Sequence, residues 1–307
     1  MADFAATRLP QARQWCVALS GGPDSLALTA AAAAALPTTA LIVDHGLQSD
    51  SAGVAAAAHE QALVLGCIAA RVLTVRVGTD GGPEAAARAA RYAALEQARD
   101  GSPVLLAHTL DDQAETVLLG LGRGSGPRSI AGMRACDPPW YRPLLDVRRS
   151  TTLAVCAELG LTAWDDPHNS DPRFTRVRLR REVLPLLEDV LNGGVAEALA
   201  RTAAALREDT DALDALATHH RVAAESGTGL DVAVLRDLPA ALRRRVIRGW
   251  LLTGGAVGLT DIQIRAVDAL VTDWHGQGGV AVGGVVPLTR LFAERTGGVL
   301  TLRSEPV

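Results

Sequence analysis

The sequence contains no lysine. Of its 307 residues, 30 are lysine or arginine, and every one of these is arginine. No lysine can therefore form a Schiff base or serve a Walker-type phosphate loop, in which a lysine reaches the β- and γ-phosphates. PLP-dependent enzymes, class I aldolases and Walker-type NTPases are excluded on this ground. A GC-rich codon bias explains the absence itself, and any phosphate must be bound by backbone amides, hydroxyls, arginine or a metal ion.

Aromatic residues and cysteines are also few. Aromatic residues make up 3% of the chain, so aliphatic side chains must form the core, and 48% of the residues are hydrophobic. The four cysteines are widely spaced without a C-x-x-C pair, which predicts reduced thiols in a cytoplasmic protein. We expect neither a secretory signal nor a bilayer-spanning segment. The net charge of −4 argues against a uniformly basic surface but allows a local arginine patch.

The first 110 residues alternate short apolar runs, typical of buried strands, with longer helical patterns. The expected strands are Trp15–Ser20, Ala40–Asp44, Arg71–Val75 and Val104–His108, and the helices are Asp24–Leu36, Ser51–Leu65, Glu84–Arg99 and Asp111–Leu121. Strands separated by helices form right-handed β-α-β units. We therefore predict an α/β fold with a parallel, doubly wound sheet.

A second, mostly helical domain is expected after the sheet. Asn192-Gly193-Gly194 is the best linker candidate because it ends a helical pattern without an apolar anchor, so we place the domains at residues 1–192 and 195–307. The later helical patterns are Val195–Ala217, Leu238–Leu252 and Asp261–Asp273. Short strands with glycine turns follow, which predicts a small β element at the end.

The strongest local motif is Ser20-Gly21-Gly22-Pro23-Asp24-Ser25, where the first strand gives way to the first helix. Ligands of open α/β sheets bind outside the carboxyl ends of the strands. The two glycines let backbone N–H groups approach an anion, and the helix N-terminus adds unpaired donors and a favourable dipole. A capped turn without a ligand is the alternative, but the full hexapeptide at this place favours a phosphate site.

Other polar residues are expected at the same edge of the sheet. Asp44 and His45 follow the second strand, where an adenosine would lie, and His108 follows the fourth. Arg88 and Arg91 are three residues apart on one helix and so share a face. A solvated arginine pair is the ordinary alternative for the last two.

Two acidic residues begin the helix after the fourth strand. Asp112 and Glu115 are three residues apart, so their carboxylates converge on the ligand edge. Paired carboxylates there can hold Mg²⁺ together with Asp24, or bind an ammonium group. Plain capping of the helix dipole is the alternative, although it does not explain why acidic and basic residues gather at one crevice.

The hexapeptide is similar to the S-G-G-x-D-S signature of the PP-loop ATP pyrophosphatases, which split ATP between its α- and β-phosphates. Within that superfamily the chain resembles the tRNA(Ile)-lysidine synthetase family over roughly residues 12–190. The further matching segments are Val43–Leu47, Arg88 with Arg91-Tyr92, His108–Thr116, Leu121–Gly126, Ile130–Met133, Arg142–Leu145, Asp165–Asp171, Arg176, Arg178, Arg180 and Leu184-Pro185. His168 and Val177 depart from the family, which usually has serine and asparagine there.

The resemblance implies an ATP-dependent ligase acting on a tRNA(Ile) with a CAU anticodon. In the first step O2 of the wobble cytidine attacks the α-phosphorus of ATP and pyrophosphate leaves. In the second, the ε-amine of free L-lysine attacks C2 of the adenylated base, which releases AMP and gives lysidine. ATP and Mg²⁺ are thus the expected substrate and cofactor.

The resemblance also implies roles for individual residues. ATP would be bound by Ser20, Gly21, Gly22, Pro23, Asp24, Ser25, Asp44, His45, Arg88 and His108. Asp24 and Asp112 would hold Mg²⁺, and Glu115 with Asp112 would grip or deprotonate the lysine amine. Arg176, Arg178 and Arg180 would contact the tRNA backbone.

The second domain carries a further group of arginines. Arg244 and Arg248 are four residues apart on one helix and so share a face. Contact with tRNA is our hypothesis for them, and a solvated basic face is the alternative. We expect no DNA and no membrane partner, while the sequence leaves the oligomeric state, including a homodimer, open.

Three alternative functions each fit part of the sequence less well. A tRNA thiolase of the same superfamily usually needs C-x-x-C pairs, which the sequence lacks. A small-molecule amide ligase, such as a relative of NAD or GMP synthetase, would not need the arginines between 176 and 180 or the helical domain. A nucleotide-binding signalling module would lack the pair Asp112 and Glu115.

Overall fold

The computed structural model describes residues 1–46, 50–78, 82–124, 126–286 and 288–306. Two compact units are found: unit 1 comprises residues 1–122 and 132–203, and unit 2 comprises residues 123–131 and 204–307. Leu47 and Ser125, which belong to two of the family-like segments, lie outside the described residues.

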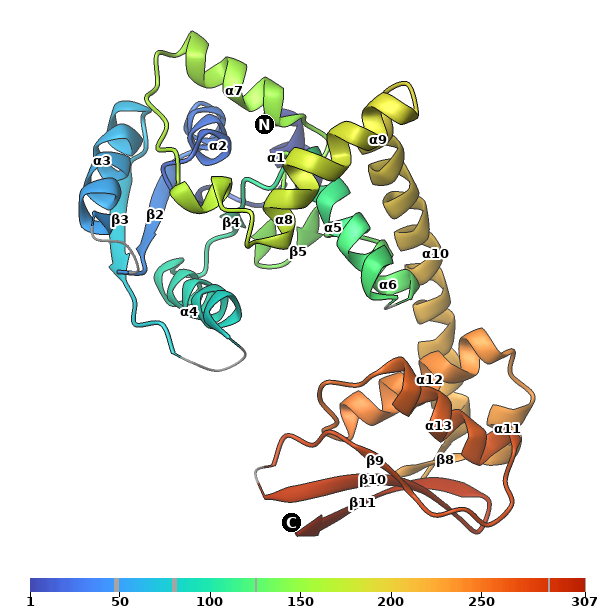
Figure 1. The fold of residues 1–307 in the computed structure, drawn as a ribbon. Coiled ribbons are helices and arrows are strands. Elements are labelled where there is room, and N and C mark those ends of the chain that lie inside the picture. Colours follow the sequence, from blue (N-terminus) through green and yellow to red (C-terminus); the bar gives the residue numbers. More distant parts are fainter. Residues whose placement is uncertain (47–49, 79–81, 125, 287, 307) are drawn as a thin grey trace. The chain divides into compact units, whose positions relative to one another are not determined.

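Unit 1 alternates strands and helices in the predicted order (Figure 1). Its elements are α1 (Ala2–Arg8), β1 (Trp15–Ala18), α2 (Pro23–Ala33), β2 (Thr38–Asp44), α3 (Ser51–Val64), β3 (Ala69–Thr74), α4 (Pro83–Ala98), β4 (Val104–Leu105), α5 (Leu110–Arg123), β5 (Cys136–Asp137), β6 (Trp140–Tyr141), α7 (Arg149–Glu158), a 3₁₀ turn (Pro167–Ser170), α8 (Thr175–Arg178), a π-helical turn (Leu179–Val183) and α9 (Leu184–Val190).

The six strands of unit 1 pair in the order β3-β2-β1-β4-β6-β5. All neighbours are parallel except β5 and β6, so the predicted doubly wound class is confirmed. The chain runs from β1 to β2 and β3 on one side and places β4 on the other side. The strand order therefore reverses between β1 and β4, which is where such sheets bind ligands.

Both faces of this sheet are buried. Trp15 and Val17 of β1 pack in a core with α2 and α3, whereas Cys16 packs with Leu95 of α4 on the opposite face. Because successive side chains of a strand point to opposite faces, a strand covered on both sides is apolar throughout. This explains the continuous hydrophobic run that predicted β1.

The unit boundary differs from the predicted one. Asn192, Gly193 and Gly194 do form the turn that ends α9, all with positive φ. The next helix, α10 (Val195–Ala224), nevertheless begins inside unit 1. Its Ala196 is buried in one cluster with Leu184 of α9 and residues of α5. The units therefore divide after residue 203, within α10, because the first turns of that helix pack on α5 and α9 of unit 1.

A short segment from the middle of the sequence belongs to unit 2. Residues 123–131, including α6 (Pro127–Ile130), cluster with that unit. Arg128 pairs with Asp214 of α10, and Arg207 of α10 donates a hydrogen bond of 2.5 Å to the carbonyl of Ala131. These polar contacts explain why residues 123–131 belong to unit 2. The order of the elements in the sequence did not predict this.

Unit 2 combines helices with an antiparallel sheet, as expected. Its other elements are β7 (Glu225–Ser226), β8 (Gly229–Asp231), α11 (Val232–Arg236), α12 (Ala240–Thr253), α13 (Asp261–Thr272), β9 (Val280–Val282), β10 (Thr289–Thr296) and β11 (Val299–Pro306). The sheet order is β7-β8-β11-β10-β9. This sheet has more strands than the sequence predicted, because β7 and β8 are too short to leave a periodic pattern in the sequence.

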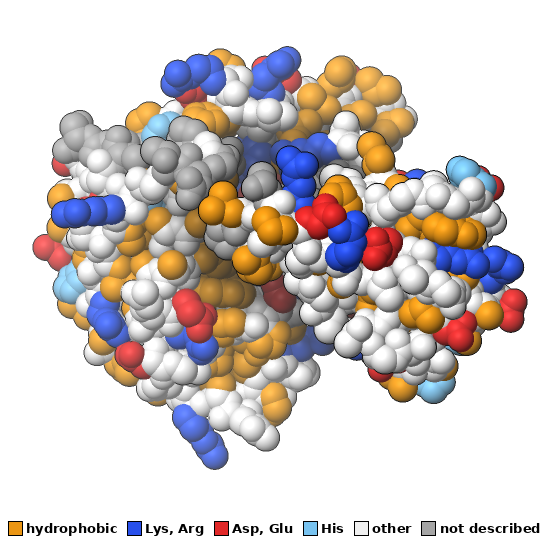
Figure 2. Space-filling view, turned by 90° about the horizontal axis from the view of Figure 1, so that it is seen from below, with side chains coloured by type: hydrophobic (Ala, Val, Ile, Leu, Met, Phe, Trp, Pro, Cys, Tyr) orange, Lys and Arg blue, Asp and Glu red, His pale blue; other side chains and the backbone are white. Residues whose placement is uncertain are grey.

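The surface and the cysteines agree with the composition. Figure 2 shows acidic, basic and apolar side chains interspersed over one face of the molecule, and no uniformly basic surface is visible on that face. All four cysteines are free thiols. Within the described residues, no helix is both long and apolar enough to cross a membrane.

Candidate active site

The hexapeptide connects β1 to α2 at the edge where the parallel strands end. Pro23 is the first residue of α2 and Gly22 its N-cap, so the unpaired N–H groups of the helix begin here. Gly21 has φ +83°, which a glycine adopts without strain. The Ser25 hydroxyl donates to the carbonyl of Gly22 at 2.9 Å and lies 3.2 Å from the Ser20 hydroxyl. The loop is thereby fixed in a form that presents backbone donors and hydroxyls to an anion.

A cavity of about 930 Å³ opens beside this loop. Its volume is within the range of sites for nucleotide-sized ligands. Of the residues predicted to bind ATP, it is lined by Ser20, Gly22, Pro23, Asp24, Ser25, Asp44, His45 and His108. The structure therefore gathers the ends of β1, β2 and β4 around one hollow, at the edge of the sheet where a ligand was expected.

Arg88 and Arg91 of α4 both lie over the ring of Tyr92, at 4.9 Å and 5.6 Å from its centre. Arg88 also donates to the Tyr92 hydroxyl at 3.3 Å, and of the two arginines Arg91 lines the cavity. Burial lowers the pKa of Arg91, and the neighbouring Arg88 lowers it further. Arg91 is thus a site residue that our assignment left out. Tyr92 fixes the face of the helix by packing edge-on against Trp140 at 4.7 Å, a contact that sequence spacing does not reveal.

Two histidines face the cavity with unused ring nitrogens. His45 Nδ1 and His108 Nδ1 are buried and have no hydrogen-bond partner within the described part of the chain. Burial, with a contribution from Arg91, lowers the pKa of His45. Burial also lowers the pKa of His108 to about 4, with Arg142 adding to the effect and Asp112 opposing it. Both rings are therefore neutral near pH 7 and can donate to or accept from a ligand.

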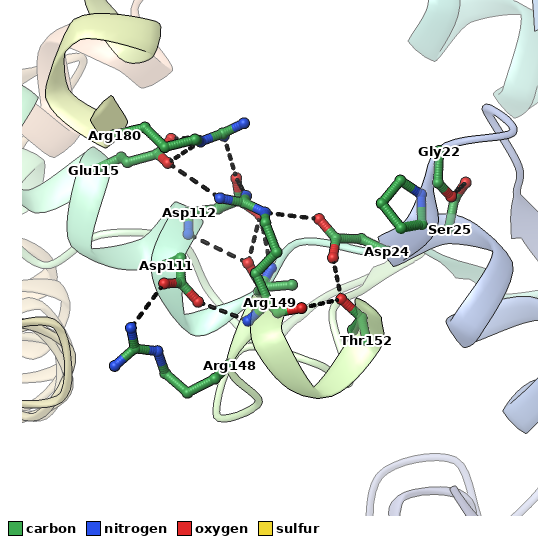
Figure 3. A network of polar contacts seen from close by, with 12 residues as sticks. Gly22, Asp24, Ser25, Asp111, Asp112, Glu115, Arg148, Arg149, Thr152 and Arg180 are labelled. Carbon is green, nitrogen blue, oxygen red and sulfur yellow. Dashed lines mark hydrogen bonds and ion pairs between the residues drawn. The ribbon is translucent and has the colours of Figure 1, made fainter. Parts of the chain in front are cut away.

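Three carboxylates from two helices meet on the guanidinium of Arg149 (Figure 3). Arg149 Nε donates to Asp24 Oδ2 at 3.1 Å, and Nη2 donates to Asp112 Oδ1 at 2.6 Å. Arg149 Nη1 lies 3.5 Å from Glu115 Oε1. The Glu115 side chain is fully buried and that of Asp112 is 12% exposed. The structure thus brings the three predicted catalytic residues together, around a cation that was not predicted.

Arg180 is the second cation of this network. Its Nε donates to Glu115 Oε1 at 2.7 Å, and its Nη2 lies 3.2 Å from Glu115 Oε2 and 3.4 Å from Asp112 Oδ1. Burial alone would raise the pKa of Asp112, but Arg149 and two hydrogen bonds from Thr109 hold it below its ordinary value. Asp112 is therefore an anion at neutral pH, ready to hold a cation.

Residues at the start of α7 hold Arg149 in place. The Arg149 N–H donates to Asp111 Oδ2 at 2.7 Å, and Asp111 also pairs with Arg148 at 3.1 Å. The Thr152 hydroxyl donates to Asp24 Oδ1, so α7 contacts the carboxylate of α2 twice (Figure 3). Arg149 and Thr152 are further site residues that the sequence did not indicate.

The other two arginines assigned to tRNA lie outside this network. Arg176 Nη2 donates to the Thr116 hydroxyl at 3.4 Å. Arg178 is exposed and pairs with Glu182 at 3.0 Å. Arg178 is two residues from Arg180 and so turns away from it, whereas Arg176 and Arg180 are four apart and both contact α5. Of the three, Arg180 is the one that binds the carboxylates.

Arg244 and Arg248 of α12 have different surroundings. Arg244 Nε lies 2.9 Å from Asp268 Oδ2 of α13, a carboxylate that the buried Arg243 also binds, at 2.5 Å. Arg248 instead lines a separate hollow of unit 2, of about 290 Å³, to which Arg244 does not contribute. The spacing predicted one shared face, but the pairing with α13 draws Arg244 away from it.

Comparisons with known proteins match both parts of the chain. A family model described as a PP-loop domain matches residues 2–187, and one described as a TilS substrate binding domain matches residues 230–296. The tRNA(Ile)-lysidine synthase of Mycolicibacterium paratuberculosis is 69% identical over 304 residues, or 99% of this chain and 95% of that protein. The protein of the same name from Nocardia farcinica is 66% identical over 290 residues, or 94% of this chain and 91% of that protein.

Among solved structures, the U34-tRNA thiolase NcsA from Methanococcus maripaludis matches with a TM-score of 0.52 and 18% identity. The match covers 64% of this chain and 74% of that chain. At this identity it supports the fold alone.

Proposed function

The chain belongs to the tRNA(Ile)-lysidine synthase family, and we propose that the three carboxylates gathered on Arg149 are the centre of its reaction. It is an ATP-dependent ligase that forms lysidine on tRNA(Ile). The thiolase and small-molecule ligase alternatives are not favoured, because the near-full-length relatives carry the lysidine synthase name. Since ATP, free lysine and tRNA meet in the cytoplasm, we place the reaction there.

The reaction couples cleavage of ATP to attack by a base oxygen. O2 of the wobble cytidine in a CAU anticodon attacks the α-phosphorus, and the bond to pyrophosphate breaks. The ε-amine of free L-lysine then attacks C2, the C2–O bond breaks, and AMP leaves with the oxygen. Each step needs residues that hold an anion and residues that position a nucleophile.

The loop after β1 is assigned to the phosphates. Its backbone N–H groups at the start of α2 point into the cavity edge, and the hydroxyls of Ser20 and Ser25 lie beside them. His45 and His108 add neutral ring nitrogens, and Arg91 adds a positive charge. This set replaces the lysine of a Walker loop, which the chain does not possess. Asp44 lies at the end of β2, where we place the adenosine.

Mg²⁺ fits Asp24 and Asp112. The two carboxylates already share one cation, because Arg149 contacts Asp24 through Nε at 3.1 Å and Asp112 through Nη2 at 2.6 Å. No group of three or more histidine, cysteine or acidic side chains in the described residues is arranged to hold a metal ion alone. This agrees with Mg²⁺, which typically takes one or two carboxylates together with substrate phosphates. When bound, the ion neutralises charge that develops on the leaving pyrophosphate.

Glu115 is assigned to the lysine amine. The amine is a cation in water and must lose a proton before it attacks, so it needs an adjacent carboxylate. Glu115 is fully buried, and Arg180 fixes it through two contacts, at 2.7 Å and 3.2 Å. Its neighbour Asp112 supplies a second negative charge. The pair holds the ammonium group and accepts its proton.

Four arginines outside the carboxylate network are assigned to tRNA. Arg176 and Arg178 lie on α8, next to the turn that carries Arg180. Arg244 and Arg248 lie in the part of the chain that matches the substrate binding domain. Arginine contacts to phosphates position an RNA, while a loop base is recognised when it is splayed out of its stack.

Mass spectrometry of the wobble nucleoside tests the proposal directly. After incubation of the protein with ATP, lysine and a CAU-anticodon tRNA, we expect the cytidine to gain one lysine with loss of water. Release of pyrophosphate should require the tRNA. Release of AMP should require both the tRNA and lysine. Release with free nucleotides in place of tRNA would contradict the assignment.

A further inference from the structure

Unit 2 contains a cavity of about 290 Å³ that the proposed chemistry does not use. It lies where α6, α10 and α12 meet. Four arginines line it: Arg128, Arg221, Arg245 and Arg248. Among its described lining residues Asp214 is the one acidic side chain. The segment that supplies Arg128 comes from the middle of the sequence and joins this unit only in the folded chain.

The acidic residues do not neutralise this cluster. Arg128 and Arg245 both bind the same oxygen of Asp214, Oδ1, the latter at 3.0 Å. Arg221 Nε lies 3.9 Å from Glu225 Oε1, at the limit of an ion pair. Four guanidinium groups therefore face two carboxylates, which leaves a net positive charge at the cavity.

Arg248 is the cation without a counterion. Within the described residues it forms no hydrogen bond or ion pair, and its side chain is half-buried. Burial lowers the pKa of Arg248, the adjacent Arg128 lowers it further, and Asp214 opposes both effects. Partial burial of an unpaired charge beside a like charge is unfavourable, so the arrangement calls for an anion.

We propose that this cavity binds one phosphate group. Phosphate oxygens only accept hydrogen bonds, and each guanidinium presents a planar fork of N–H donors that matches them. The cavity is about a third as large as the ATP-site hollow, which suits a single anion rather than a nucleotide. One source, which rests on the proposed function, is a backbone phosphate of bound tRNA. Free phosphate or the released pyrophosphate is the other source.

Arg248→Gln is the variant that tests the cavity, because it removes one charge and breaks no hydrogen bond within the described chain. Arg265→Gln is its matched control. Arg265 lies in the same unit, is 57% exposed and pairs with Asp261 outside the cavity. Both variants lose one positive charge, so they share any effect of net charge. Thermal unfolding of each without ligand verifies that the fold is intact.

The first measurement is the affinity of the full chain for labelled tRNA(Ile), without ATP or lysine, over a series of salt concentrations. We expect R248Q to weaken binding about tenfold and to reduce the slope of log affinity against log salt by about one. R265Q should change neither. Because no turnover is involved, this result is independent of whether lysidine forms.

The second measurement is the rise in Tm on addition of inorganic phosphate. If the cavity takes a free anion, R248Q loses part of the rise that R265Q keeps, while tRNA affinity stays as in the unmodified chain. A loss in the first measurement supports a tRNA phosphate, and a loss in the second alone supports a free anion. If R248Q matches R265Q in both, the cavity is no phosphate site.

Discussion

Arg149 Nη2 lies 2.6 Å from Asp112 Oδ1, so the carboxylate that we assign to magnesium already holds a cation in the free protein. The same guanidinium contacts Asp24 at 3.1 Å. A metal ion bound by these two carboxylates would use the oxygens that Arg149 contacts. The ion and the Arg149 side chain therefore compete for the same oxygens. Arg149 therefore stabilises the acidic cluster before the substrates bind, and the proposed metal ion would have to replace some of its contacts.

Replacing Arg149 by glutamine should expose this competition. The variant leaves three partly buried carboxylates with Arg180 as their one remaining cation in the network. Breaking a buried pair on one side leaves uncompensated charge, so we expect a loss of about 2–3 kcal/mol in the free energy of unfolding. Added Mg²⁺ without ATP should restore part of the loss, because it takes the place of the missing cation. Thermal unfolding with and without MgCl₂ measures both effects.

The unmodified chain is the reference for that experiment. Its Tm should respond weakly to Mg²⁺, since Arg149 already occupies the carboxylates. Arg148→Gln is a matched control, because Arg148 precedes Arg149 but pairs with Asp111 and Glu197 instead of the three carboxylates. If R149Q is as insensitive to Mg²⁺ as the unmodified chain, Asp24 and Asp112 are not the metal ligands.

Replacing Asp112 by asparagine should abolish turnover while the fold is retained. The amide keeps the size of the side chain and removes the charge that holds the metal and the amine. Losing a group with these roles lowers kcat by a factor on the order of 10²–10⁴. Lysidine formation under saturating substrates measures the change. Asp189→Asn, an exposed residue of α9 outside the cavity lining, should retain most activity, and near-normal activity of D112N would remove Asp112 from the site.

Replacing Glu115 by glutamine should act on lysine more than on ATP. Glu115 binds Arg180 and lies 3.5 Å from Arg149, and its assigned ligand is an ammonium group. Loss of one charged hydrogen bond costs about 1.5–3 kcal/mol, so we expect KM for lysine to rise at least tenfold. Steady-state kinetics with each substrate varied in turn separates the two constants. Glu182→Gln, which touches the exposed Arg178, is the control, and equal rises in both KM values would argue for a general structural role of Glu115.

The sequence predicted residues whose position follows from the topology. Asp24 and Asp112 both stand just after a strand of one parallel sheet, so the strand order alone brings them to one edge. Arg149 has no such signal, because an arginine at the start of a helix is ordinarily solvated. Only the packing of α7 against α2 places its guanidinium between the carboxylates. Long-range packing, unlike strand order, leaves no local pattern to read.

The arginines near residue 178 show the same limit. They are spaced two apart, which on a strand would align them on one face and on a helix turns them apart. The structure makes this segment helical, with a π-helical turn over Leu179–Val183. Arg178 therefore faces solvent and Arg180 the carboxylates. Which of these arginines reaches the carboxylates depends on how the helix is rotated about its axis. The sequence did not predict that rotation.

Stability should fall in mild acid partly because of His108. Its pKa is about 4 in the folded protein, against an ordinary value of 6.5. Below about pH 6.5 the unfolded chain therefore binds a proton that the folded chain does not, so the contribution of His108 is complete above pH 6.5 and is lost as the pH falls towards 4. At about pH 5 the loss is roughly 2 kcal/mol, at about 1.4 kcal/mol per pH unit.

His108→Gln should remove this part of the acid sensitivity. Urea unfolding at about pH 7.5 and about pH 5 gives the free energy of unfolding at each pH, and we expect H108Q to lose roughly 2 kcal/mol less than the unmodified chain between them. The pKa of His45 is also lowered by burial, but His45 is present in both proteins, so the difference isolates His108. His219→Gln, an exposed histidine of α10, controls for the loss of a histidine as such. If H108Q and H219Q lose equal stability between the two pH values, His108 does not resist protonation in the folded chain.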